Sequence, residues 1–220
     1  LKIVSFGIKK DSDIRLISIS KKKQINVARV NIKSEIFKLN FKNINIYNIL
    51  SSLALLHELN LNIKKVIKYY HNYEPSEGRG KIHIIKRYKK KFKLIDESYN
   101  ANPLSVKNAI QNFDSIKKQN FKKYLLLGDM LELGKKSEIL HKDLSKVINN
   151  SDIDKVFIKG KKTLSTYKNI IKEKRGNIFQ TDEDLDFTLN NIISNNDYLM
   201  IKGSNATGLN NLSKKMIRGF

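Results

Sequence analysis

The sequence predicts an α/β protein in two parts, the second being a mostly parallel, Rossmann-like sheet with helices on both faces. From Gly80 onward, short apolar runs alternate with segments of helical periodicity, as buried parallel strands and their crossover helices do. Residues 1–41 instead show short strand-like runs separated by charged turns. Between the parts, "EPSEGRGK" at 74–81 contains a proline, two glycines and charges but no apolar residue, which is typical of a domain junction.

The first part, 1–77, is expected to hold a small, antiparallel sheet followed by two helices. Its strand-like runs are "KIVSFG", "DIRLISIS", "INVARVNI" and "EIFKLNF". The first helix is indicated by apolar residues at helical spacing, namely Ile46, Ile49, Leu50, Leu53 and Leu56. A second helix is predicted over 63–70, with Val66 and Tyr70 on one face.

The second part, 78–220, is expected to alternate strands and helices to its end. Strands are predicted at "KIHIIKRY", "FKLIDES", "KYLLLGDM", "KVFIKG", "NIFQ" and "DYLMIKGS". One helix begins at Pro103 after the N-cap Asn102, and the others are predicted over 137–149, 164–172, 182–193 and 208–217. No G-x-G-x-x-G follows the first strand, so the fold alone does not indicate a dinucleotide.

The net charge of +22 could indicate nucleic-acid binding. However, the excess is nearly all lysine spread along the chain. No known nucleic-acid-binding module is present, and arginine, which contacts phosphates and bases bidentately, is scarce. The runs "KKK" at 21–23 and "YKKKFK" at 88–93 are expected to be solvated turns. We therefore predict no nucleic-acid partner, and a basic nucleic-acid binder remains an alternative.

Several other classes of protein are disfavoured by composition. The absence of cysteine excludes disulfides, thiolate zinc sites and a cysteine nucleophile within this sequence. No run approaches the ~20 apolar residues that a membrane-spanning helix needs. The sequence starts at Leu1 with a strand-like pattern rather than a signal peptide. We expect a cytoplasmic chain that is a piece of a longer protein.

Polar, glycine-punctuated segments follow four of the predicted strands: "DESYNANP", "GDMLELG", "KG" at 159–160 and "KGSNATG". Because ligands of open parallel sheets bind at the carboxyl ends of the strands, these segments should form one site. A helix cap explains Asn102 and Pro103 but not the five polar residues before them, which are Asp96, Glu97, Ser98, Tyr99 and Asn100. A turn that only connects a strand to a helix would need fewer hydrogen-bonding side chains, so the turn at 96–100 indicates a functional site.

The segments "IDESYNANPLSVKNAI", "LLLGDMLELGKKSEILH" and "IKGS" resemble the C-terminal half of the Mur ligases, most closely the MurF branch. The resemblance is sharp from Gly78 to about Ser204 and extends more loosely through "IYNILSSLALL". It implies the end of a central ATP-binding domain over 1–77 and a complete C-terminal domain over 78–220. The phosphate-binding G-x-x-x-x-G-K-[ST] loop and the Mg²⁺ ligands of the family are expected upstream, so the chain should contain no catalytic residue and be inactive alone.

The resemblance also implies an activity and its partners. Mur ligases use ATP to phosphorylate a carboxylate, and an incoming amine then displaces the phosphate to form a peptide bond. For the MurF branch the expected substrates are UDP-N-acetylmuramoyl-tripeptide and D-alanyl-D-alanine, joined in peptidoglycan synthesis for cell-wall biogenesis, cell shape and division. A monomer is expected.

Matching positions suggest individual roles. Cofactor-binding residues are expected to be Asn48, Arg79, Asp96 and Glu97, with Glu97 replacing the second of two aspartates. Substrate-binding residues are expected to be Ser98, Asn100, Asn102, Asp129, Met130, Glu132, His141, Lys202, Gly203 and Ser204. Two positions depart from the family pattern: Ile44 replaces a histidine, and Asn205 replaces an arginine.

Structural explanations compete with several of these roles. His141 could be an ordinary helix histidine, Glu132 a surface acid, Lys202 a lysine whose stem covers a strand end, and Tyr99 a packing residue. If the turn is functional, Asp96→Ala or Asn100→Ala should lower turnover of the complete enzyme with little loss of stability. A stand-alone nucleotide-binding or peptide-binding module without catalysis is the second functional alternative.

Overall fold

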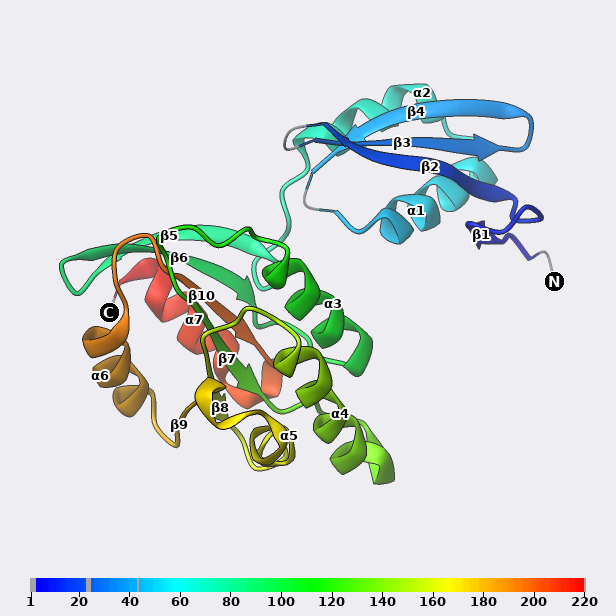
Figure 1. The fold of residues 1–220 in the computed structure, drawn as a ribbon. Coiled ribbons are helices and arrows are strands. Elements are labelled where there is room, and N and C mark those ends of the chain that lie inside the picture. Colours follow the sequence, from blue (N-terminus) through cyan, green and yellow to red (C-terminus); the bar gives the residue numbers. More distant parts are fainter. Residues whose placement is uncertain (1–2, 23–24, 43, 220) are drawn as a thin grey trace. The chain divides into compact units, whose positions relative to one another are not determined.

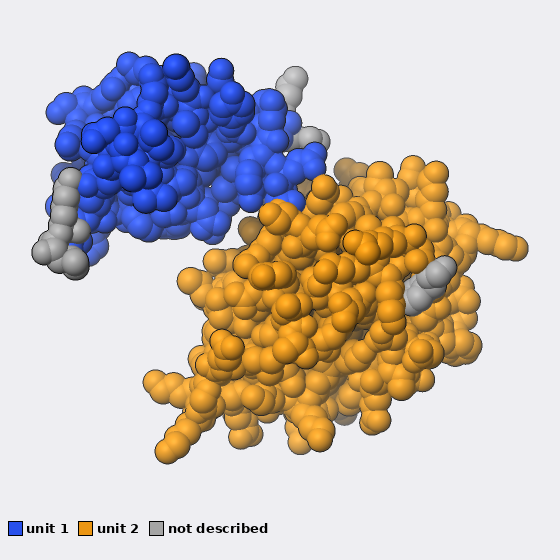
Figure 2. All heavy atoms as spheres, turned by 180° about the vertical axis from the view of Figure 1, so that it is seen from behind, with its two compact units in different colours: residues 1–75 blue, residues 76–220 orange. Residues whose placement is uncertain are grey.

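The computed structural model describes residues 3–22, 25–42 and 44–219. The chain divides into two compact units, Leu1–Pro75 and Ser76–Phe220, which Figure 2 colours separately. The division falls inside the junction predicted at 74–81. Lys2 of the first expected strand and Lys23 of the "KKK" turn lie outside the described residues.

Unit 1 contains a four-stranded sheet of order β1-β2-β3-β4, shown in blue in Figure 1. The strands are β1 (Phe6–Gly7), β2 (Ile14–Lys22), β3 (Ile25–Ile32) and β4 (Glu35–Phe41). The predicted antiparallel pairing is confirmed for β2, β3 and β4, but it is wrong for β1, which runs parallel to β2. The loop between them is closed by the Ser5 hydroxyl and amide, which donate to the Asp13 carboxylate at 2.7 and 2.8 Å.

Two helices follow the strands of unit 1. The first, α1 (Ile46–Glu58), buries Ile49, Leu50, Leu53 and Ala54, close to the pattern predicted from helical spacing. The second is shorter than predicted: α2 (Ile63–Val66) passes into a 3₁₀ turn over Ile67–Asn72. The apolar sides of α1 and α2 share one core with the sheet.

Unit 2 has a six-stranded sheet of order β5-β6-β10-β7-β8-β9. Only β5 is antiparallel to its neighbour, so the predicted mostly parallel sheet is confirmed. Its strands are β5 (Lys81–Arg87), β6 (Lys90–Glu97), β7 (Lys123–Gly128), β8 (Lys155–Lys159), β9 (Arg175–Ile178) and β10 (Tyr198–Lys202).

Helices cover both faces of this sheet, as predicted (Figure 1). They are α3 (Pro103–Asp114), α4 (Ser137–Asn149), α5 (Leu164–Asn169), α6 (Asp182–Ile192) and α7 (Leu209–Arg218), with 3₁₀ turns at Gly134–Lys136, Lys172–Lys174 and Asn205–Thr207. Helices α3, α4 and α5 pack on one core, whereas α6 and α7 pack on the other. Asn102 and Ser105 form a reciprocal capping box at the start of α3.

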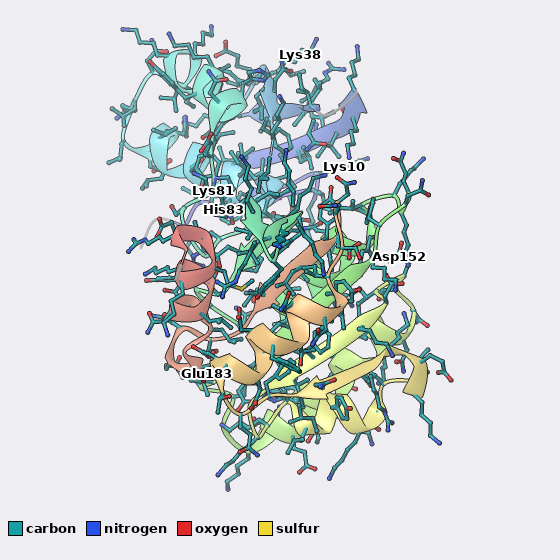
Figure 3. The ribbon with its side chains drawn as sticks, turned by 90° about the vertical axis from the view of Figure 1, so that its left-hand side faces the viewer. Lys10, Lys38, Lys81, His83, Asp152 and Glu183 are labelled. Carbon is teal, nitrogen blue, oxygen red and sulfur yellow. The ribbon has the colours of Figure 1, made fainter. Side chains whose placement is uncertain are left out.

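Charged side chains extend from the surface of both units (Figure 3), and Lys10, Lys38 and Glu183 among them are exposed. Some charged groups are internal, and among them the Lys123 side chain is fully buried at the amino end of β7. Its Nζ donates to the Asp152 carboxylate at 2.6 Å and to the Asp114 carbonyl at 2.9 Å. Among the described residues, no helix is long and apolar enough to cross a membrane.

Candidate functional site

The loops that follow β6, β7, β8 and β10 emerge at one edge of the unit 2 sheet, because these four strands are adjacent and parallel. Strand β10 leads to α7 on one face, while its neighbours β6 and β7 lead to α3 and α4 on the other. Loops that diverge in this way open a crevice at the carboxyl edge of the sheet. The polar segments singled out in the sequence lie at this edge.

Asp96 is fully buried, and its carboxylate is used within unit 2. Oδ2 accepts the Gly78 N–H at 2.8 Å, and Oδ1 accepts the Ser98 hydroxyl at 2.6 Å and the Ser98 N–H at 3.3 Å. Ser98 is also fully buried and accepts the Asn210 amide at 3.2 Å. Asp96 and Ser98 therefore stabilise the turn and offer no accessible polar atom to a ligand.

Lys202 is only 2% exposed at the end of β10. Its Nζ donates to the Asn100 carbonyl at 2.5 Å and approaches the Glu97 carbonyl at 3.4 Å and Oε2 at 3.3 Å. Burial lowers the pKa of Lys202, the Glu97 carboxylate opposes this shift, and Arg79 adds to it. The ammonium thus ties the 97–100 turn to β10, which leaves the partly exposed Glu97 carboxylate as the accessible acid.

Arg79 and Tyr99 form an exposed pair beside this turn. The guanidinium of Arg79 lies 4.5 Å from the centroid of the Tyr99 ring, a cation–π arrangement that orients the guanidinium. Its N–H groups have no hydrogen bond with another described residue and can meet solvent or a ligand. Tyr99 is 47% exposed. Because Arg79 also influences the pKa of Lys202, the pair lies in the same electrostatic environment as Glu97.

Asn100 and Asn102 are both exposed but differ in their engagement. The Asn102 side chain accepts the Ser105 N–H at 2.8 Å as the cap of α3, so its oxygen is occupied. Asn100 contributes its backbone carbonyl to Lys202, and in the part of the chain that the structure describes its side-chain amide has no hydrogen bond. Asn100 is the amide in this turn that is available to a ligand.

Asp129, after β7, organises the loop that follows β8. Its Oδ1 accepts the N–H groups of Lys162 and Thr163 at 3.1 and 2.8 Å and the Thr163 hydroxyl at 3.0 Å. A Cβ at Gly160 would lie 2.2 Å from Oδ1, so only glycine permits this approach. Within the described residues, the other oxygen, Oδ2, has no hydrogen bond and remains available.

Met130 and His141 are buried and serve the fold. His141 Nε2 accepts the Met130 N–H at 3.0 Å, and Nδ1 lies 2.7 Å from the Ser137 carbonyl. A carbonyl only accepts and an amide N–H only donates, so the imidazole carries its proton on Nδ1. Both ring nitrogens are occupied by backbone groups, and the structural explanation for His141 is the better one.

Gly203 and Ser204 join neighbouring loops. The Ser204 hydroxyl accepts the Leu131 N–H at 3.0 Å and lies 3.3 Å from the Ala101 carbonyl, to which it donates. A Cβ at Gly203 would lie 3.2 Å from the Cα of Gly128, so glycine allows β7 and β10 to end close together. These residues position the loops around the crevice without presenting a free polar group to it.

Glu132 is exposed and has a left-handed backbone with φ of 62°. A non-glycine residue in this conformation is uncommon and is often retained at functional turns. Its carboxylate makes no hydrogen bond or ion pair with other described residues. The geometry is therefore compatible with ligand contact by Glu132.

A cleft of about 530 Å³ lies beside Asp129, at the ends of β7, β8, β9 and β10. Its lining combines polar and apolar groups: Asp129, Leu131, Lys159, Gly160, Lys161, Leu164, Ile178, Phe179, Gln180, Ala206 and Thr207. Lys159 is engaged in an ion pair with Asp182, whereas the Lys161 side chain is exposed. The cleft can hold a small zwitterion between a carboxylate and a lysine.

The sequence did not single out several residues that the structure places at or beneath this edge. Lys161 and Gln180 line the cleft, Thr163 binds Asp129, and Asn210 binds Ser98. The "KG" segment pointed to the loop of Lys161, but no pattern distinguished this lysine from its neighbours. Asn210 lies in a helix far along the chain, where sequence spacing carries no information about the turn at 96–100.

Asn48 belongs to unit 1, where it is exposed in the first turn of α1. Ile44, which replaces the expected histidine, is partly buried against the unit 1 core. The described residues contain no group of three or more His, Cys, Asp and Glu side chains that could hold a metal ion.

Comparison with known proteins identifies similar families and relatives. A family model described as Mur ligase, glutamate ligase domain, matches residues 80–205. The UDP-N-acetylmuramoyl-tripeptide–D-alanyl-D-alanine ligase of Bacillus subtilis is 35% identical over 127 residues, which cover 56% of this chain and 28% of the relative. The ligase of the same name from Buchnera aphidicola subsp. Baizongia pistaciae is 29% identical over 226 residues, covering 100% of this chain and 47% of the relative.

The fold is also similar to solved structures. A MurF ligase from Thermotoga maritima in complex with ADP matches with a TM-score of 0.75 at 19% identity, covering 96% of this chain and 47% of that one. A MurF from Acinetobacter baumannii matches with a TM-score of 0.76 at 20% identity, covering 99% and 47%. The chain thus spans at most about half the length of these relatives.

Proposed function

The chain belongs to the Mur ligase family, and from that premise we propose that it is the C-terminal part of an ATP-dependent ligase of peptidoglycan synthesis. The ligase would join D-alanyl-D-alanine to UDP-N-acetylmuramoyl-tripeptide. The observation that carries this proposal is the match of the whole chain to about half of a ligase of that name. The accessible groups at the carboxyl edge of the unit 2 sheet support it.

ATP would supply the phosphoryl group that activates the tripeptide carboxylate, and the dipeptide amine would displace the phosphate to form the new peptide bond. Arg79 and Glu97 fit a nucleotide because one is an exposed, oriented guanidinium and the other an accessible carboxylate. The guanidinium can donate to phosphate or ribose oxygens in pairs, and the carboxylate can accept from ribose hydroxyls. Asn48 is a further candidate for the nucleotide, on unit 1.

The cleft beside Asp129 fits the dipeptide. The free Oδ2 of Asp129 can accept a hydrogen bond from the dipeptide amine, and Lys161 can attract the terminal carboxylate. Leu131 and Leu164 in the lining can contact the small methyl side chains. Holding the amine in a fixed direction lowers the entropic cost of its attack, so orientation is the task we assign to these residues.

Asn100, Asn102 and Glu132 are exposed beside these positions and are proposed to contact the peptide portions of the substrates. Met130, His141, Ser98, Lys202, Gly203 and Ser204 would act indirectly, because the structure uses their polar groups to hold the loops. Movement of the domains in the complete enzyme would exclude water from the activated carboxylate, which hydrolysis would otherwise destroy. Mg²⁺ would be held by residues outside this chain, and no step here depends on it.

We also propose that the enzyme is a cytoplasmic monomer without a nucleic-acid partner.

The ligase proposal is tested by measuring phosphate release from ATP with UDP-N-acetylmuramoyl-tripeptide and D-alanyl-D-alanine both present. The 220-residue chain is compared with a protein that includes the upstream part of its reading frame. Release that requires both substrates and the longer protein is expected, with none from the chain alone. If neither protein releases phosphate, the ligase proposal is refuted and a binding module is favoured.

A further inference from the structure

A buried chain of hydrogen bonds runs from α7 to the beginning of unit 2. The Asn210 amide donates to the Ser98 hydroxyl at 3.2 Å, and that hydroxyl donates to Asp96 Oδ1 at 2.6 Å. Asp96 Oδ2 then accepts the Gly78 N–H at 2.8 Å. Asn210, Ser98 and Asp96 are each at most 5% exposed, so water does not replace these contacts in the folded protein.

The segment Gly78–Gly80 lies flat against the same turn. The Gly78 carbonyl accepts the Tyr99 N–H at 3.2 Å, and the Gly80 N–H donates to the Asp96 carbonyl at 2.7 Å. A Cβ at Gly78 would lie 2.6 Å from the Tyr99 Cβ, and one at Gly80 would lie 2.8 Å from Glu97 Oε1. Both glycines also have positive φ, 74° and 94°, so other residues would be strained there.

Asn210 is not required by the helix that contains it. It is the second residue of α7, and the N-cap position, Gly208, makes no side-chain cap. Of the other buried residues of the helix, Leu209, Leu212 and Met216 are apolar and Ser213 is polar. A buried amide among them costs stability unless it is hydrogen-bonded, and its one hydrogen bond with a described side chain is that to Ser98.

We infer that Asn210, Ser98 and Asp96 form a clamp that fixes Gly78–Gly80 to unit 2 and makes Asn210 a positioning residue for Arg79. Arg79 moves with unit 2, and its guanidinium keeps its place over Tyr99 during any domain movement. On the proposed function, on which this last step rests, the clamp delivers a preoriented arginine to the nucleotide.

Amide hydrogen exchange of the 220-residue chain tests the clamp without any substrate. Asn210→Ala should raise exchange of the Gly78 and Gly80 amides by about tenfold, since one hydrogen bond of the chain is lost. Ser98→Ala should do the same. Asn211→Ala, an exposed neighbour on α7, should change nothing. Amides of β7 should keep their wild-type exchange in all three variants.

Unchanged exchange at residues 78–80 in Asn210→Ala and Ser98→Ala would overturn the clamp. An equal rise over the whole of unit 2 would also overturn it, because Asn210 would then serve general packing only. In the complete enzyme, Asn210→Ala should raise the KM for ATP about fivefold while kcat stays within twofold, and Asn211→Ala should alter neither. Because the exchange experiment needs no activity, failure of the clamp and failure of the proposed function are distinguishable.

Discussion

Replacement of Asp96 by alanine should destabilise unit 2 strongly, in contrast to the expectation from sequence that it would mainly affect turnover. The substitution leaves the Gly78 N–H, the Ser98 N–H and the Ser98 hydroxyl without their acceptor. An unpaired buried donor costs roughly 1–3 kcal/mol. Part of this cost is offset because the variant no longer has to desolvate a buried carboxylate. The net decrease in the free energy of unfolding should therefore be about 3 kcal/mol.

Urea and thermal unfolding of the 220-residue chain, followed by far-UV circular dichroism, measure this loss. For a domain of this size about 3 kcal/mol corresponds to a fall in Tm of roughly 6–12 °C. Asp96→Asn keeps the shape and one acceptor, so it should lose less than Asp96→Ala. Asn100→Ala is the matched control, because its side chain is exposed and should matter by less than about 0.5 kcal/mol.

A loss below about 0.5 kcal/mol for Asp96→Ala, equal to that of Asn100→Ala, would refute this reasoning. It would mean that water or a rearranged turn satisfies the three donors. The Asp96 carboxylate would then be free to serve a ligand, as the sequence suggested. A large loss assigns Asp96 to the fold and leaves Glu97 as the acid that can meet the nucleotide.

Three further predictions follow from the same structure. His141→Ala should lower the free energy of unfolding in urea by about 3 kcal/mol, because it leaves the Met130 N–H unpaired and opens a cavity. A decrease below about 1 kcal/mol would contradict a structural role. Lys161→Ala should raise the KM of the complete enzyme for D-alanyl-D-alanine about tenfold. Lys168 is exposed on α5, and Lys168→Ala should leave this KM unchanged. Equal KM values for the two variants would exclude Lys161 from the dipeptide site. Burial, aided by Asp197 and Asp154, raises the pKa of Tyr124 to about 12. The protonated phenol therefore contributes stability that is fully present below pH ~10 and is lost as the pH rises toward 12. Unfolding of Tyr124→Phe between pH 10 and 12 should lack this loss, and an identical pH dependence would refute it.

The fold was largely predictable because its signals are local. Continuous apolar runs identified the buried parallel strands, and Asn102 with Pro103 identified the start of α3. The direction of β1 was not predictable, since it depends on contacts between Ser5 and Asp13 that pair a two-residue strand with β2.

The site was less predictable, because polarity in a turn does not reveal whether a side chain faces the ligand or the protein. Lys202 lies at the end of β10 and His141 lies in α4. The Lys202 ammonium is bound by the carbonyl of Asn100, which is distant in sequence. The His141 ring is bound by backbone groups of Met130 and Ser137. Hydrogen bonds from a side chain to backbone groups leave no pattern in the sequence. The hydrogen bond of Asn210 to Ser98 beneath the turn leaves none either.

One part of the site follows from the strand period alone. In β6, Phe92 and Leu94 face the core shared with α7. Because successive side chains of a strand alternate between faces, Asp96 and Ser98 continue on that buried side, as observed. Glu97 and Tyr99 point to the other side and remain accessible.

Alternate residues of the polar turn at 96–99 therefore have two different roles. Asp96 and Ser98 bind the glycines of the junction and the amide of α7, so the turn is rigid before any ligand arrives. Glu97 and Tyr99, with Arg79 lying on the tyrosine ring, present the groups that a ligand can meet. A rigid support beneath exposed groups reduces the ordering cost of binding. We therefore expect substitutions at the buried positions to lower stability and those at the accessible positions to lower ligand affinity.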